Sequence, residues 1–66
     1  MSDTFSSRLK SARQTAGLSQ PQLAERAGVP LTSLRQLEQG RRGGPTLATA
    51  RKLALALGVS LDELAG

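Results

Sequence analysis

The sequence contains no cysteine, histidine, tryptophan or tyrosine, and Phe5 is its only aromatic residue. Without cysteine and histidine, the chain can form neither a disulfide framework nor a zinc site with thiolate or imidazole ligands. It also lacks the Ser–His and Cys–His pairs and the histidine proton relays on which most nucleophilic and acid–base catalysis depends. These absences argue against an enzyme, and we expect no catalytic residue, no metal and no cofactor.

Long apolar segments are also missing. The longest apolar run is LALAL, Leu53–Leu57, whereas a membrane span needs about 20 apolar residues. The first ten residues, MSDTFSSRLK, include an early acidic residue and no apolar stretch of the kind found in signal peptides. The basic, amphipathic pattern around Phe5 and Leu9 would suit a membrane surface, but the core needs the same apolar stripe. We therefore expect no membrane partner.

The length and net charge of the chain further narrow the classes of protein to which it can belong. The 66 residues suffice for one small domain, which we place over residues 1–66. Nine lysine and arginine residues stand against five aspartate and glutamate residues, which gives a net charge of +4. A basic balance of this kind favours a polyanionic partner, most often a nucleic acid.

Apolar residues recur at helical spacing, and leucine and alanine greatly outnumber valine and isoleucine, which predicts an all-α fold. Glycines and capping residues divide the chain into expected helices over residues 4–16, 19–28, 30–39 and 46–58, with a short helix from residue 60. Arg8 and Lys10 are expected in solvent, and Leu55 is expected to point away from the core. The core face of the fourth helix is predicted to carry Leu47, Ala50, Leu53, Ala54 and Leu57.

The most informative stretch is QPQLAERAGVPLTSLRQLEQ, residues 20–39. It predicts two helices joined by a short turn, with Gly28 where the chain needs a positive φ and with the small Ala24 where the helices cross closely. Leucine and valine side chains on both sides of the turn would hold the second helix against the first. The pattern is that of a helix-turn-helix motif.

The second helix of this motif has two chemically different faces. At 100° per residue, Leu34, Leu37 and Glu38 point inward. The outward arc holds one hydroxyl, one guanidinium and two amides, without a carboxylate. Amides can bond to adenine and arginine to guanine in the major groove, although an ordinary solvated helix face would have the same composition. The outward residues are Thr32, Arg35, Gln36 and Gln39.

From Arg8 to Leu64 the chain resembles the lambda-repressor-like family (Cro/C1-type, or XRE). The resemblance rests on RLKSARQTAGLSQ, LAERAGV, LRQLEQG and PTLATARKLALALGVSLDEL. It implies a compact five-helix domain with its core at about residues 8–64 and the helix-turn-helix motif in helices two and three. It also implies a cytoplasmic, nucleoid-associated repressor of bacterial or phage origin, which binds a two-fold-symmetric operator in double-stranded DNA as a homodimer.

The resemblance also assigns roles to single residues. Gln20 matches a DNA contact at the start of the second helix, and Arg13 and Glu38 match an ion pair between the first and third helices. An unpaired inward carboxylate would be costly, so this pair is also physically reasonable. Dimer contacts would fall near the fifth helix, at Leu61 and Leu64. The residues that we predict to contact DNA are Gln20, Leu31, Thr32, Arg35, Gln36, Arg41, Arg42 and Thr46.

Several of these assignments have alternatives. Leu31 either packs on the core or contacts a thymine methyl group. Arg41 and Arg42 either clamp phosphates or belong to a solvated loop, since one RRGG stretch is too weak a signal for RNA binding. Thr46 is expected to cap a helix whose free amides can also meet a phosphate. Pro30 stands where the family usually has a serine or threonine cap.

The main alternative function is that of an antitoxin or another protein-interaction module whose DNA binding is secondary. Leu55 would then be a candidate contact with a protein partner or a second subunit, although single exposed leucines are common.

Overall fold

The computed structural model describes residues 4–40 and 45–65, and within these ranges all regular structure is helical. α1 spans Phe5–Thr15, α2 Gln20–Ala27, α3 Leu31–Glu38, α4 Leu47–Leu57 and α5 Leu61–Ala65. Each expected helix is present, and each predicted bound lies one residue outside the observed one. The all-α prediction is confirmed.

Local side-chain chemistry explains where the helices begin. The hydroxyl of Thr4 accepts a hydrogen bond from the amide of Ser7 at 3.2 Å and begins α1. Ser19 and Gln22 form a reciprocal capping box at the start of α2, with distances of 2.8 and 3.2 Å. Each such cap satisfies amides that would otherwise lack partners, and losing one costs about 1 kcal/mol. In a chain this small, correct capping is a sizeable part of total stability.

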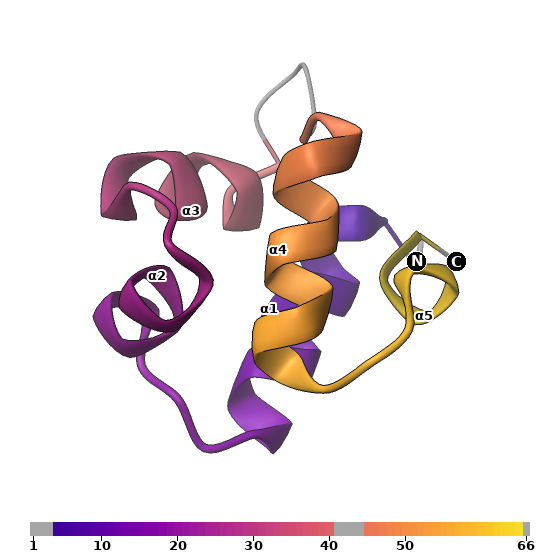
Figure 1. Cartoon of the computed structure of the whole chain (residues 1–66), viewed down its shortest axis with the longest axis horizontal. Coiled ribbons are helices and arrows are strands. Elements are labelled where there is room, and N and C mark those ends of the chain that lie inside the picture. Colours follow the sequence, from indigo (N-terminus) through magenta and orange to yellow (C-terminus); the bar gives the residue numbers. More distant parts are fainter. Residues whose placement is uncertain (1–3, 41–44, 66) are drawn as a thin grey trace.

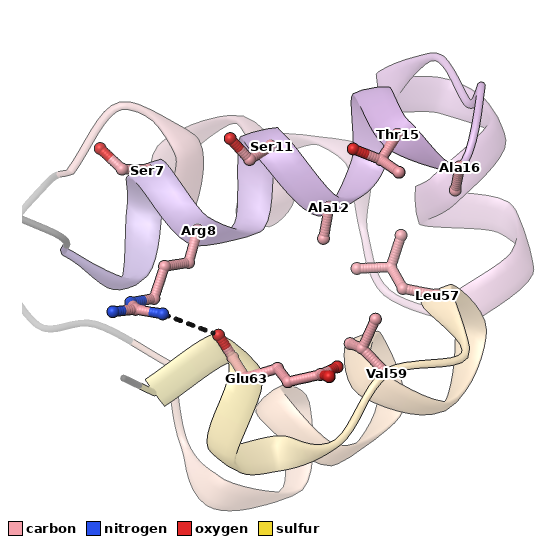
Figure 2. Close-up of a pocket in the computed structure, with 9 residues that line it drawn as sticks. All are labelled: Ser7, Arg8, Ser11, Ala12, Thr15, Ala16, Leu57, Val59 and Glu63. Carbon is pink, nitrogen blue, oxygen red and sulfur yellow. Dashed lines mark hydrogen bonds between the residues drawn. The ribbon is translucent and has the colours of Figure 1, made fainter.

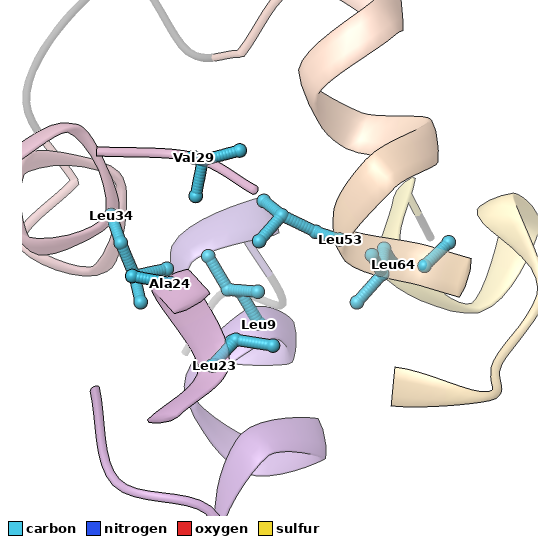
Figure 3. Packing of buried hydrophobic residues seen from close by; sticks show 8 residues of the cluster. Leu9, Leu23, Ala24, Val29, Leu34, Leu53 and Leu64 are labelled. Carbon is cyan, nitrogen blue, oxygen red and sulfur yellow. The ribbon is translucent and has the colours of Figure 1, made fainter. Parts of the chain in front are cut away.

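The helices surround one hydrophobic core. α1 packs against α3 and α5, α2 packs against α3 and α4, and α4 packs against α5. Figure 1 shows α4 between the helix-turn-helix pair α2–α3 on one side and α5 on the other. Burying one leucine contributes about 1.5–3 kcal/mol. The fully buried leucines, all labelled in Figure 3, are Leu9, Leu23, Leu34, Leu53 and Leu64.

The structure corrects the predicted face of α4 at one position. Leu47 is 64% exposed, whereas Ala50, Leu53 and Ala54 are buried as expected. Leu47 is the first residue of α4, so its side chain projects from the end of the helix, beyond the packed middle turns. Helical periodicity alone cannot predict the exposure of Leu47, because it gives no information on where the neighbouring helices lie. Leu55 is 83% exposed, as predicted.

A second correction concerns Arg8, which is half-buried and not fully in solvent. It lines a hollow between α1 and the C-terminal part of the chain, shown in Figure 2. Nη1 of Arg8 donates a hydrogen bond to the carbonyl oxygen of Glu63 at 3.3 Å. Arg8 therefore helps to hold α5 against α1, whereas Lys10 is exposed as expected.

No helix in the described part of the chain has both the length and the apolar character needed to cross a membrane.

Candidate nucleic-acid interface

The turn between α2 and α3 begins at a left-handed glycine. Gly28 has a φ of 72° and donates its N–H to the carbonyl of Ala24 at 2.9 Å, and the N–H of Val29 reaches the same carbonyl at 3.0 Å. A Cβ added at position 28 would meet no atom within 4 Å. Glycine is thus required by the backbone conformation and not by lack of space. The predicted helix-turn-helix motif is present.

α3 presents a polar outer face. Leu34 and Glu38 are buried, and the opposite arc is exposed at Thr32, Arg35, Gln36 and Gln39. α1 and α2 both pack against α3 and hold its inward face. Its N-cap, Pro30, makes no side-chain capping hydrogen bond, in agreement with the sequence-based expectation. The result is a supported helix with amide, hydroxyl and guanidinium groups directed outward, the set that can form hydrogen bonds with base edges.

A buried carboxylate joins the first three helices. Nε of Arg13 lies 2.6 Å from Oε2 of Glu38, and Nη2 of Arg13 donates to Oε1 at 3.1 Å, which makes the pair bidentate. The side chains are 12% and 2% exposed, respectively. Nη1 of Arg13 also donates to the carbonyl of Leu18 at 2.9 Å. The expected contact between Arg13 and Glu38 is therefore present.

Gln20 belongs to the same network. Its Nε2 donates to Oε1 of Glu38 at 3.0 Å, so the first residue of α2 is bonded to the last residue of α3. Helical periodicity gives no signal for this bond, because the two residues are 18 positions apart and lie on different helices. One N–H and the carbonyl oxygen of the amide remain for a contact with DNA. Glu38 thus restricts the orientation in which Gln20 can make the contact that we expect from it.

Leu31 is half-buried and packs against the hydrophobic core. This is the packing role that the sequence left open, and it fits the position of Leu31 as the first residue of α3. Contact with a thymine methyl group stays a prediction.

Thr46 caps α4. Its Oγ1 accepts a hydrogen bond from the amide of Thr49 at 3.1 Å, and its own hydroxyl donates to Oγ1 of Thr49 at 3.1 Å. The remaining amides of the first turn carry the partial positive charge of a helix N-terminus. Thr46 is exposed, so this end of α4 is accessible from solvent. Arg41 and Arg42, the other predicted phosphate contacts, lie outside the described residues.

The two residues expected at a dimer contact have different environments. Leu61 is half-buried and keeps some accessible surface. Leu64 is 1% exposed and belongs to the core of its own chain. Its inward orientation on the short helix α5 leaves its side chain no surface for a second chain, so we remove Leu64 from the expected contacts.

Within residues 4–40 and 45–65 there is no group of three or more acidic, histidine or cysteine side chains that could hold a metal ion. The polar groups described above are suited to hydrogen bonding and charge pairing.

The chain has clear relatives. Residues 9–64 match a protein-family model described as helix-turn-helix. The cryptic phage CTXphi transcriptional repressor RstR of Vibrio cholerae serotype O1 is 41% identical over 59 residues, which are 89% of this chain and 52% of that protein. The HTH-type transcriptional repressor RghR of Bacillus subtilis is 36% identical over 62 residues, which are 94% of this chain and 46% of that protein. This chain thus spans about half the length of these curated relatives.

A solved structure has the same fold. The restriction-modification controller protein C.AhdI from Aeromonas hydrophila superposes with a TM-score of 0.85 at 37% sequence identity. The match covers 91% of this chain and 89% of that one. The likeness therefore extends well beyond the two helices of the motif.

Proposed function

Because the chain belongs to the Cro/C1-type (XRE) helix-turn-helix family, we propose that it is a sequence-specific transcriptional repressor that binds double-stranded DNA. Two of its relatives are named as transcriptional repressors, and its structural neighbour is named as a controller protein. The proposal concerns a DNA-binding regulator and assigns no catalytic role to any residue. Such a regulator would act in the bacterial cytoplasm, at the nucleoid.

The observation that carries this proposal is the outer face of α3. Thr32, Arg35 and Gln36 are exposed there on a helix whose inner face is buried against α1 and α2. A rigid support matters because bidentate hydrogen bonds to a base need the side chain to approach at a defined angle. We propose that α3 enters the major groove and that these residues, together with Leu31, contact base edges.

Contacts with the DNA backbone would fix the register of α3. Gln20 at the start of α2 and Thr46 at the start of α4 lie at helix N-termini, where backbone amides favour phosphate oxygens. Arg41 and Arg42 are proposed as phosphate contacts from their charge and place in the sequence alone. Together with the net charge of +4, these contacts would make binding strongly salt-dependent.

We further propose that the chain binds as a homodimer, with Leu61 near the contact. Two copies would then occupy half-sites about 34 Å apart, one helical turn of DNA, and block polymerase sterically. The two-fold symmetry of the protein would be matched by a two-fold-symmetric operator.

The test is selection from a random duplex DNA pool at near-physiological salt, followed by sequencing of the bound fraction. Enrichment of a two-fold-symmetric motif is the expected result. The Gln36→Ala variant should shift the enriched sequence. A matched variant, Gln14→Ala, removes an exposed amide from α1, a helix outside the helix-turn-helix pair, and should select the wild-type motif.

Two outcomes would contradict the proposal. Salt-sensitive binding without an enriched sequence would mean that α3 fills the groove without distinguishing bases. An absence of duplex binding would favour the alternative, in which the chain is an antitoxin or interaction module and its main partner is a protein.

A further inference from the structure

The side-chain nitrogen of Gln20 carries two hydrogens, and one of them has a partner inside the protein. It donates to Oε1 of the buried Glu38 at 3.0 Å. The carboxylate of Glu38 also accepts two hydrogen bonds from Arg13. Gln20 is half-buried at the first position of α2. Its amide therefore has an occupied inner side, and one N–H and the carbonyl oxygen are left on the outer side.

The chemistry of Glu38 decides which way round the amide of Gln20 lies. The two ends of a glutamine amide are alike in size, and rotation about one bond exchanges the donor with the acceptor. A carboxylate only accepts hydrogen bonds, so a reversed amide would place its oxygen against the oxygen of Glu38 with no hydrogen between them. This contact is repulsive, and more so where burial excludes water. Glu38 therefore holds the nitrogen of Gln20, and not its oxygen, at the junction of α2 with α3.

A DNA phosphate has the same hydrogen-bonding requirement as Glu38. Its ionised oxygens are acceptors, so the side chain of Gln20 can bind a phosphate only through its nitrogen. With one hydrogen on Glu38, the nitrogen has a second hydrogen to donate and can bridge the two anions. The charge of Glu38 does not oppose this arrangement, because the guanidinium of Arg13 neutralises it through the bidentate pair.

We infer that Glu38 is a positioning residue for DNA binding, which acts by holding the amide nitrogen of Gln20 toward a phosphate of the duplex. The role rests on the proposed function and deepens it. The family resemblance gives Glu38 an ion pair with Arg13 and gives Gln20 a DNA contact, and the hydrogen bond between the two side chains links these roles. Without Glu38, the amide of Gln20 can turn its oxygen toward the phosphate, and the contact is then lost.

The first test compares glutamine with lysine at position 20, because an ammonium group has only donors and cannot be turned the wrong way. Arg13→Met combined with Glu38→Leu removes the carboxylate, leaves neither charge of the pair behind and keeps the net charge at +4. With glutamine at position 20, these two changes should lower affinity for duplex DNA about tenfold, since a hydrogen bond to an ionised group is lost. With Gln20→Lys, the same two changes should not lower it.

A purely structural role of the ion pair predicts a different pattern. If Glu38 acted only by holding α1, α2 and α3 together, its loss would lower DNA affinity by the same factor with glutamine and with lysine at position 20. Equal losses would therefore overturn the inference. Circular dichroism checks that each variant keeps its helical fold before binding is measured.

The second test locates the phosphate with duplexes in which one phosphate at a time is replaced by a neutral methylphosphonate. At one position, the replacement should weaken binding of the wild type and have no effect on Gln20→Met. Gln14→Met is the matched control, because it replaces an exposed amide of α1, and it should respond to every replacement as the wild type does. If no position distinguishes Gln20→Met from the wild type, Gln20 does not bind a phosphate and the inference fails.

NMR spectroscopy of the unaltered chain tests the orientation of the amide even if the variant without Glu38 does not fold. In the free chain, one Nε2 hydrogen of Gln20 should resonate downfield of its counterpart in the exposed Gln14, because it is bonded to a carboxylate. Adding duplex DNA should move the other Nε2 hydrogen of Gln20 downfield as well. An unchanged second resonance in the complex would contradict the bridge between Glu38 and a phosphate.

Failure of this role can be told apart from failure of the proposed function. Affinities are measured on a duplex with the selected motif and on a scrambled duplex of the same composition. A wild type that binds both duplexes equally would contradict sequence-specific repression, yet the comparison of glutamine with lysine remains measurable, because a phosphate contact carries no sequence information. A wild type that prefers its motif, but loses Glu38 with equal effect in both backgrounds, would overturn the positioning role alone.

Discussion

Nε2 of Gln20 lies 3.0 Å from Oε1 of Glu38, so the first residue of α2 is hydrogen-bonded to the last residue of α3. The same carboxylate accepts two hydrogen bonds from Arg13 on α1. One buried side chain thus connects α1, α2 and α3, the helices that form or support the proposed DNA-binding face. Because the buried carboxylate of Glu38 is bonded to both Arg13 and Gln20, the angle between α2 and α3 is restricted by hydrogen-bond geometry as well as by packing.

Removing the buried carboxylate should be strongly destabilising. Glu38→Ala leaves the guanidinium of Arg13 without its bidentate partner in a largely buried position, and breaking such a pair costs about 3 kcal/mol or more. Urea denaturation followed by circular dichroism measures the loss. Arg13→Met combined with Glu38→Leu should recover much of it, because no charge is then left unpaired. Lys10→Ala, which removes an exposed cation from α1, is the control, and a Glu38→Ala variant as stable as this control would contradict the prediction.

Gln36→Ala should relax base preference at one position of the half-site. The exposed amide on α3 is proposed to form a bidentate contact, and losing such a contact costs about 1–3 kcal/mol against the preferred base only. Competition titrations with duplexes substituted at single base pairs measure this difference. A uniform loss of affinity for all duplexes would show that Gln36 contacts the backbone instead.

Leu31→Ala should lower stability more than it changes sequence preference. Leu31 is half-buried against the core, so its truncation should cost about 1–2 kcal/mol of unfolding free energy. Leu31→Met conserves most of the volume and should remain close to the wild type. A variant of wild-type stability that no longer distinguishes thymine from other bases would support the methyl contact and contradict the packing role.

Position 46 can separate helix capping from phosphate binding. Thr46→Ala should cost about 1 kcal/mol of stability, because the hydrogen bond to the amide of Thr49 is lost. Thr46→Asp and Thr46→Asn both retain a capping oxygen and should both be stable. If the N-terminus of α4 lies near a phosphate, the aspartate variant alone should bind every duplex several-fold more weakly. Equal DNA affinity of the aspartate and asparagine variants would show that no phosphate lies near the N-terminus of α4.

Gly28→Ala should destabilise the chain by about 1–2 kcal/mol through the backbone alone. The position has a φ of 72°, and an added Cβ meets no atom within 4 Å. Gly28→Asn should be milder, since asparagine tolerates the left-handed conformation better than alanine. Thermal or urea unfolding of both variants provides the comparison. If alanine is tolerated as well as asparagine, the positive φ does not limit stability.

The helix boundaries were predictable because they depend on residues close together in the chain. Ser19 with Gln22 and Ser60 with Glu63 each form a capping box with two reciprocal hydrogen bonds, at 2.8–3.2 Å and 3.1 Å. A cap involves residues three positions apart, so its energetics are already contained in the sequence. The inward position of Glu38 followed from helical periodicity in the same way, and the ion pair with Arg13 from the family resemblance.

The wrong predictions share one cause. Leu47 was expected in the core and is 64% exposed, and Arg8 was expected in solvent and bonds to Glu63. In both cases the outcome depends on where a neighbouring helix ends or begins, which periodicity along one helix does not encode. Leu64 differs from these two, since the family resemblance assigned it to a dimer contact, whereas α1 and α4 pack against its helix and its side chain is 1% exposed.

The sequence by itself determined the number of helices, their capped ends, the glycine turn and the polar outer face of α3, because these follow from local backbone preference and from periodicity. Only the tertiary structure decided that Gln20 is bonded to Glu38 and that Leu55 forms one surface with Leu61 of another helix. Such relationships arise when separate helices pack, since packing brings side chains from distant positions within a few ångströms. Local sequence thus determines the helices, and the packing of the helices against one another determines which side chains share a surface.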